Sequence, residues 1–246
     1  ECKCEAYAYG HQYCDFSDGT LVCLTPGESI SMKENNKEFP SKGWILAFHP
    51  DLICGTPLGL NIHNYTFFSY CPEEALHLSL REKQIILEFL ERIRQELERC
   101  IDRHSKKIIS KYIELLLDYC TRFYERQFIT RNEANKQIIG RFNRLLDHHF
   151  HTIQSQSADL PTIEDCAGSL HLSPAYFNDL LEYETGKSFK EYLQFKRFET
   201  AKDWLINTDK PLNQIAQELG FRNAQYFSRL FKKMTGCPPN GFRMPN

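Results

Sequence analysis

The sequence predicts an α+β protein that is mostly α-helical, with a small β domain first, a helical hairpin next and an all-α domain last. Three observations lead to this prediction. Short aromatic and β-branched segments broken by turns come first, apolar residues at helical spacing follow from residue 79, and an internal repeat occupies the last part of the chain. At 246 residues and 41% hydrophobic content, the chain has enough material for two domains.

The first 75 residues predict a small β domain, either an antiparallel sheet or a barrel. Segments that resemble strands alternate there with turn signals. The turn signals are Ser17-Asp18-Gly19, Pro26-Gly27 and Ser41-Lys42-Gly43. Four aromatic residues suit a core or the lining of a small-molecule cavity equally well, namely Tyr7, Tyr9, Trp44 and Phe48.

A helical hairpin is predicted over residues 76–130. Ser79 followed by Glu82 is a capping-box signature, and Asp102 to Ser105 supply the turn between the helices. The apolar stripes are Ile86, Leu90, Ile93, Leu97 and Ile101 in the first helix, and Ile108, Ile109, Tyr112, Ile113, Leu116, Cys120 and Phe123 in the second. A stripe does not identify its partner, so the hairpin either covers the sheet or forms a homodimer through residues 80–125.

Residues 135–246 predict an all-α domain that contains an internal repeat. A helix over residues 138–150 and a loop at "HTIQSQSADLP" come first. The segments "AYFNDLLEYETG" (175–186) and "QYFSRLFKKMTG" (225–236) then share Tyr-Phe, a leucine and Thr-Gly at an offset of 50 residues. Each follows a short helix signal, "TIEDCAGSLHLS" or "LNQIAQELGF". The repeat therefore predicts two helix-turn-helix units, at about 162–186 and 212–236.

The second helix of the later unit has one apolar and one cationic face. Phe227, Leu230, Phe231 and Met234 recur at helical spacing and predict a buried face, whereas Gln225, Ser228, Arg229 and Lys232 recur on the opposite face. From Phe221 to Asn246 the chain has five basic residues and no acidic one. Before this helix, Ala216 permits close helix packing and Gly220 permits the positive φ of a tight turn.

These features predict a helix that enters the major groove of DNA. Glutamine can pair with adenine and arginine with guanine through two hydrogen bonds each, while serine and lysine can hold phosphates. The predicted DNA-binding residues are Gln225, Tyr226, Ser228, Arg229, Lys232 and Lys233 in the second unit, and Ala175, Tyr176, Asn178 and Asp179 in the first. The alternative is an ordinary solvated basic face. The repeat favours DNA, because a helix over residues 189–206 would be about 27 Å long, near the roughly 34 Å between successive major grooves.

The sequence also resembles a known family. "IAQELGF", "YFSRLFKKMTG" and "PPNGFR" look like the C-terminal signature of AraC-type transcription regulators, over about residues 135–243. "AFHPDL", "FFSY" and "CTRFYERQFITR" are similar to a subgroup with an N-terminal cupin-like sensor and a helical hairpin. The resemblance implies a small-molecule effector, and leaves a contact with RNA polymerase open. More strands precede "DGTLVCLTPGE" in that subgroup, so we expect this chain to begin partway through the barrel.

The two repeat copies differ in charge. Asn178, Asp179 and Glu182 stand where the second copy has Ser228, Arg229 and Lys232. Asp179 fits the AraC subgroup pattern, whereas Glu182-Tyr183 replaces what is more often a basic pair. Carboxylates near phosphates are unfavourable, although they can accept a hydrogen bond from cytosine. We expect the first copy to be the weaker reader.

Metal and enzyme chemistry have little support. Cys2-x-Cys4 with His11 and Cys14 lacks a partner pair at zinc spacing, His148, His149 and His151 suit a polar helix end, and His49 and His63 stand alone. No phosphate-binding glycine loop, Gly-x-Ser-x-Gly elbow or His-Glu-x-x-His motif occurs. The ten cysteines predict mostly reduced, buried thiols. We expect no enzyme activity, no cofactor and no metal.

The predicted function is a sequence-specific transcription regulator. It would bind double-stranded promoter DNA through two helix-turn-helix units in successive major grooves, as a homodimer under the control of an effector. No apolar run approaches the roughly 18 residues of a membrane span and no secretory signal is visible, so we expect a cytoplasmic protein. Two alternatives stay open: a protein-interaction module built on the β domain and hairpin, and a metal-dependent cupin enzyme with a DNA-binding tail.

Overall fold

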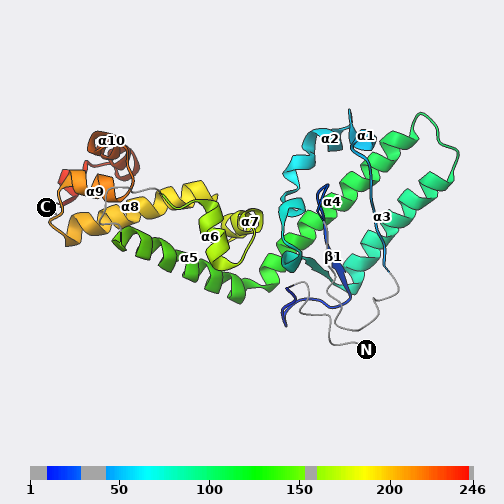
Figure 1. The fold of residues 1–246 in the computed structure, drawn as a ribbon, viewed down its shortest axis with the longest axis horizontal. Helices are drawn as coiled ribbons and strands as arrows, with labels where there is room; N and C mark the ends of the chain where they lie inside the picture. The colour runs from blue at the N-terminus through cyan, green and yellow to red at the C-terminus, as the bar shows by residue number, and fades with distance from the viewer. Residues whose placement is uncertain (1–9, 29–42, 153–159, 244–246) are drawn as a thin grey trace. The chain divides into compact units, whose positions relative to one another are not determined.

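The computed structural model describes residues 10–28, 43–152 and 160–243, which divide into two compact units (Figure 1). Unit 1 ends at Asn132 and unit 2 begins at Glu133. The prediction of a mostly helical α+β chain is confirmed by the elements of both units. No helix of the described segments is long and apolar enough to cross a membrane.

Unit 1 contains a two-stranded antiparallel sheet. Strand β1 (Gly19–Leu21) pairs with β2 (Leu76–Leu78), and Gly19 stands opposite Leu78. The antiparallel pairing agrees with the sequence prediction, but the cupin-like barrel is not found, because the described residues contain these two strands only. The edge of β2 away from β1 is held by Gln127, which accepts a hydrogen bond from the His77 N–H at 2.8 Å and donates one to the Ala75 carbonyl at 3.0 Å.

Residues 50–74 were predicted as part of a β domain, and this prediction is wrong. They form short helices: α1 (Pro50–Ile53), α2 (Pro57–Asn61), η1 (Ile62–Asn64), η2 (Thr66–Ser69) and η3 (Pro72–Glu74). A proline at the first helical position has a φ angle suited to a helix and lacks an N–H that would be unpaired. Side chains also cap these starts, since His49 accepts from the Asp51 N–H and Thr56 from the Gly59 N–H. Capping and proline placement therefore outweighed the aromatic, strand-like composition.

The helical hairpin is confirmed. Helices α3 (Leu80–Glu98) and α4 (Ser105–Thr130) run side by side (Figure 1). Ser79 and Glu82 form the predicted capping box. Their stripes pack inside the same chain, with Leu90 9% and Leu116 5% exposed. The C-terminal end of the first stripe differs, because Leu97 is 57% and Ile101 78% exposed.

A buried ion pair joins residue 15 to the end of α4. Arg131 follows α4 directly, and its Nε and Nη2 donate to the two carboxylate oxygens of Asp15 at 2.9 and 2.5 Å. The side chains are 5% and 0% exposed. Burial raises the pKa of Asp15, but the hydrogen bonds and charge of Arg131 outweigh burial, so the pKa lies below its ordinary value.

The described cysteines correct the prediction of mostly buried thiols. Among the eight described cysteines, none of which is in a disulfide, Cys54, Cys71 and Cys100 are exposed, so most are not buried. Trp44 is 51% exposed, Phe48 is half-buried, and Tyr7 and Tyr9 lie outside the described residues. Neither Trp44 nor Phe48 borders the two hollows considered below.

Unit 2 is all α-helical and contains the two predicted helix-turn-helix units. Helices α6 (Ile163–Leu170) and α7 (Pro174–Thr185) form the first, and α9 (Leu212–Glu218) and α10 (Ala224–Thr235) form the second. Helix α8 (Phe189–Asn207) connects them as predicted, and α11 (Pro239–Arg243) closes the domain (Figure 1). Helix α5 spans Asn132–Thr152, so it begins six residues before the predicted start at Ile138. Most of the predicted loop after it, residues 153–159, lies outside the described residues.

The turns of the two helix-turn-helix units differ in length by one residue, so the offset between the repeat copies is not constant. Both α6 and α9 end in a Schellman motif, in which a residue with positive φ follows the helix. The bonds run from the Leu172 and His171 N–H to the Ala167 and Gly168 carbonyls, and from the Phe221 and Gly220 N–H to the Ala216 and Gln217 carbonyls. Gly220 stands 49 positions after His171, whereas the next cap, Asn223, stands 50 after Ser173. The second turn thus has one additional residue, Arg222, which is exposed.

Candidate nucleic-acid interface

Helix α10 has a buried aromatic face. Phe227 and Phe231 are each 0% exposed, with ring centroids 5.5 Å apart, and Phe221 lies 4.9 Å from Phe227. Leu230 is half-buried, as the stripe predicted. Met234 was predicted on this face, but it is 61% exposed. The ring of Phe242 packs on Phe231, with 5.5 Å between the ring centroids.

The opposite face of α10 is cationic, and no described residue neutralises it. Gln225, Arg229 and Lys232 are exposed, and none of their side chains forms a hydrogen bond or ion pair with the described residues. The same holds for the side chains of Lys233 in the last turn of α10 and of Arg222 in the turn before it. The four positive charges therefore have no partner in the described part of the chain, unlike a surface network of alternating charges.

Other predicted residues of α10 have mixed roles. Tyr226 is 45% exposed, so its ring can contact a partner. Ser228 is half-buried, and its Oγ donates to the Ala224 carbonyl at 2.8 Å. The helix start is fixed by Asn223, whose Oδ1 accepts from the Tyr226 N–H at 2.7 Å. Arg222 was not among the predicted contact residues, although the one-residue change in the repeat offset could have revealed it.

Arg197 attaches the connecting helix α8 to the second turn. It is 7% exposed, its Nε donates to the Leu219 carbonyl at 2.7 Å, and its guanidinium lies 3.8 Å from the centroid of the Phe221 ring. Burial lowers the pKa of Arg197 to about 10, so it stays protonated near neutral pH. A cation at the end of α9 also interacts favourably with the helix dipole. Sequence periodicity placed this residue on α8 but did not show what it contacts.

Replacing Arg197 with leucine is expected to lower the stability of unit 2 by about 1–3 kcal/mol, because the buried Leu219 carbonyl would lose its partner. Chemical denaturation followed through Trp204, which is 2% exposed in the same unit, measures the change. Lys196→Leu, at the neighbouring half-buried position, is the control. An equal effect of the two variants would contradict the assigned role.

The first helix-turn-helix unit presents a different surface. Tyr176 is 3% exposed, and Asn178 accepts from the Phe189 N–H at 3.1 Å, so Asn178 caps the start of α8. Ala175 and Asp179 are half-buried, whereas Glu182 is exposed. We therefore remove Tyr176 from the predicted interface, because its ring belongs to the core. The surface of α7 that carries Asp179 and Glu182 is acidic, whereas the corresponding surface of α10 is basic.

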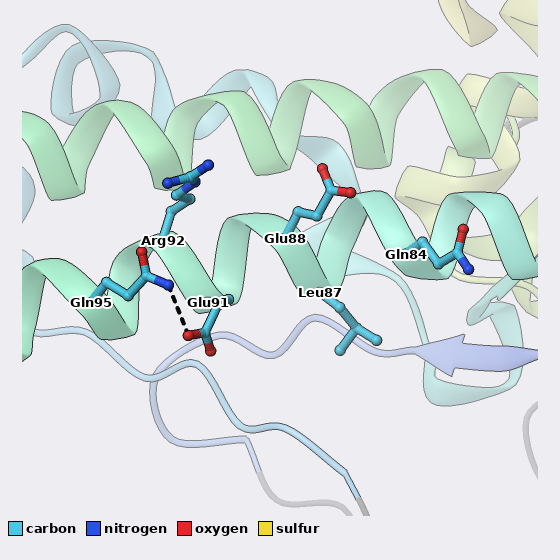
Figure 2. A pocket seen from close by; sticks show the side chains of 6 residues that line it. All are labelled: Gln84, Leu87, Glu88, Glu91, Arg92 and Gln95. Atoms are coloured by element: carbon cyan, nitrogen blue, oxygen red, sulfur yellow. Dashed lines mark hydrogen bonds between the residues drawn. The ribbon is translucent and has the colours of Figure 1, made fainter.

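A second feature is a hollow of about 660 Å³ in unit 1, which lies along α3 (Figure 2). Its lining residues are Gln84, Leu87, Glu88, Glu91, Arg92 and Gln95. Hydrogen bonds from Arg94 and from Gln95 (2.9 Å) lower the pKa of Glu91 to about 2, so this carboxylate stays ionised and does not suit a general acid. Figure 2 shows side chains of one helix surface, which is typical of a solvated face. In the described segments no three His, Cys, Asp or Glu side chains gather as a metal site would require.

Comparison with known proteins agrees with the geometry of unit 2. A family model described as a helix-turn-helix domain matches residues 166–244. The HTH-type transcriptional regulator YtdP of Bacillus subtilis is 32% identical over 112 residues, which are 46% of this chain and 14% of that protein. YobQ of the same organism, also an HTH-type transcriptional regulator, is 36% identical over 37% of this chain and 38% of its own length.

One relative extends over both units. The HTH-type transcriptional regulator YijO of Escherichia coli is 24% identical over 225 residues, which are 92% of this chain and 76% of that protein. This chain spans less than half the length of YtdP and of YobQ. The matched residues 166–244 extend from within α6 to the end of α11, with both turns and the cationic face of α10. The C-terminal unit of this chain therefore carries a helix-turn-helix domain of the AraC type.

Proposed function

We propose that this chain is a sequence-specific transcription regulator that binds double-stranded promoter DNA, with a small molecule bound by unit 1 as its effector. The observation that supports DNA binding is the cationic face of α10, whose Arg229 and Lys232 have no partner among the described residues. It lies opposite a face fixed by Phe227 and Phe231. A contact with RNA polymerase belongs to the same proposal through the family resemblance.

The connecting helix supports binding to two successive major grooves. Helix α8 has 19 residues and is therefore about 28 Å long, near the roughly 34 Å of one DNA turn. Its two ends lie beside the two helix-turn-helix units (Figure 1). In this proposal α10 is the main reader, and α7 contributes less because Asn178 is used as a helix cap.

Arg229→Ala is expected to weaken binding to the preferred DNA by about 1–3 kcal/mol and to relax preference at one base pair, since arginine can pair with guanine through two bonds. Lys232→Ala is expected to weaken binding to all sequences alike and to reduce the salt-dependence slope by about one, as for a lost phosphate contact. Binding of selected and random duplexes at several salt concentrations measures both effects.

Variants of the first helix-turn-helix unit provide the comparison. Asp179→Ala is expected to change affinity less than Arg229→Ala. If α7 approaches DNA, Glu182→Lys should tighten binding to random sequence and steepen its salt dependence, because it replaces a repelled carboxylate with a cation. Equal losses from Asp179→Ala and Arg229→Ala, with the same sequence footprint, would disprove the dominance of α10. A protein that binds no duplex at all would favour the interaction-module alternative.

We also propose a homodimer through the loop end of the hairpin. Leu97, Ile101 and Ile108 are 57%, 78% and 36% exposed there, in contrast to the buried middle of the stripes. Leu97→Glu is expected to shift the sedimenting species from dimer to monomer, because a charge would enter the apolar contact. Leu60→Glu, at a residue that is 74% exposed elsewhere in unit 1, is the control. Leu90 and Leu116 are unsuitable test sites because they are buried within one chain. The proposal would be wrong if the wild-type protein sedimented as a monomer, or if Leu97→Glu did not change the mass of the sedimenting species.

A further inference from the structure

A groove of about 340 Å³ lies in unit 1 between the start of α3 and the C-terminal half of α4. Three arginines line it: Arg81 from α3, and Arg122 and Arg126 from α4. Glu82 is the only carboxylate among its lining residues. The groove is therefore cationic, although the chain as a whole has a net charge of −2.

Two of these arginines have no carboxylate partner. Arg81 is exposed and makes no hydrogen bond or ion pair with the described residues. Arg122 is exposed, and its guanidinium lies 5.3 Å from the centroid of the Tyr119 ring. A guanidinium stacked on an aromatic ring is held in place while its N–H groups stay available to an anion.

The third arginine is only partly paired. Arg126 Nε and Nη2 donate to Glu82 at 3.0 and 2.9 Å, and Nη2 also donates to the His77 carbonyl at 2.7 Å. Its Nη1 is buried and has no hydrogen-bond partner within the described part of the chain. A buried donor without an acceptor is uncommon, and an acceptor brought by a ligand would satisfy it.

The walls of the groove are aromatic. The Phe16 ring lies 4.7 Å from the Arg126 guanidinium, and Phe16 is 40% exposed. Tyr119 forms another part of the wall. Apolar walls with a few convergent polar groups are typical of small-molecule sites, and the volume falls in their usual range of roughly 300–1,000 Å³.

We propose that this groove binds a small organic anion, with a carboxylate or phosphate group held by the arginines and an aromatic or apolar body against Phe16 and Tyr119. Arginine forks match both anionic groups. The inference deepens the effector role proposed for unit 1. Its test measures ligand binding alone, so it can fail without any consequence for DNA binding by unit 2.

The test uses the full chain and titration calorimetry with benzoate, hydroxybenzoate and phenyl phosphate. Benzamide provides the neutral ring, and inorganic phosphate provides the anion without a ring. We expect at least one of the aromatic anions to bind, at least tenfold more tightly than benzamide and inorganic phosphate. Preference for the benzoates would identify a carboxylate ligand, and preference for phenyl phosphate a phosphate ligand.

Arg81→Gln and Arg122→Gln are each expected to weaken that binding at least tenfold. Both residues are exposed, so these variants should fold, which circular dichroism checks. Arg92→Gln is the matched control, because Arg92 is an exposed arginine of α3 that borders the other hollow. Three results would overturn the proposal: no binding of any aromatic anion, equal binding of inorganic phosphate, or equal effects of the control and the groove variants.

Discussion

Replacing Arg131 with methionine is expected to destabilise unit 1 by about 3–5 kcal/mol, because it would leave a buried carboxylate without its partner. The Asp15 side chain is 0% exposed and accepts two hydrogen bonds from Arg131. Arg131 also donates to the Gly10 carbonyl at 3.2 Å, so it connects two backbone regions far apart in sequence. Hydrogen exchange of the α4 amides reports the opening of unit 1 separately from that of unit 2.

The effect of this variant should depend on pH. Since Arg131 depresses the folded-state pKa of Asp15, the pair contributes stability above the unfolded pKa, near 3.8, and loses it as the pH falls through the lower folded value. In Arg131→Met, burial, which is the largest influence on Asp15, would raise its pKa against the smaller effects of the Gln12 N–H and of His77, so protonation would relieve the defect. The stability difference between wild type and variant should therefore be largest near neutral pH and should shrink below about pH 4.

Two further variants test the cause. Asp15→Asn combined with Arg131→Met should recover most of the loss, because it removes the unpaired charge. Arg94→Met breaks exposed pairs with Glu91 and Glu98 within unit 1 and should change stability far less, because exposed ion pairs contribute little. If Arg131→Met proved no more harmful than Arg94→Met, the buried ion pair would not stabilise unit 1.

Phe142→Ala is expected to lower the stability of unit 2 by about 3–5 kcal/mol, the usual cost of removing a buried phenylalanine ring. Phe142 comes from α5, is 0% exposed, and lies 4.9 Å from Phe177 and 5.9 Å from Phe189 between ring centroids. The matched family segment begins at residue 166 and omits α5. We therefore expect unit 2 to need α5 as part of its core, although α5 lies outside the matched segment.

Trp204 fluorescence measures this prediction. The sequence has two tryptophans, Trp44 and Trp204, so a Trp44→Phe background leaves one reporter, in unit 2. Leu145→Ala, at a 37% exposed position of the same helix, is the control and should cost far less. Similar losses for Phe142→Ala and Leu145→Ala would show that α5 is peripheral to the core.

Particular elements show how far local signals extend. The Ser79–Glu82 capping box and the paired apolar stripes predicted the hairpin, because a cap and a 3.6-residue period act within a few turns of chain. The strand prediction for residues 50–74 was wrong because Pro50 and Pro57 begin helices that aromatic composition did not indicate. For the dimer, the stripes were insufficient, since α3 and α4 pack on each other and Leu90 and Leu116 are buried within one chain.

The sequence by itself determined the two helix-turn-helix units, the connecting helix and the opposed faces of α10, because these depend on periodicity, helix caps and local charge. Only the tertiary structure decided which residues of those faces are available. Tyr226 is 45% exposed and its counterpart Tyr176 is 3% exposed, although the repeat aligns them. Asn178 is used to cap α8, and Arg197 is buried against the second turn. The physical reason is that exposure depends on which helices pack around a residue, and such contacts join residues distant in sequence.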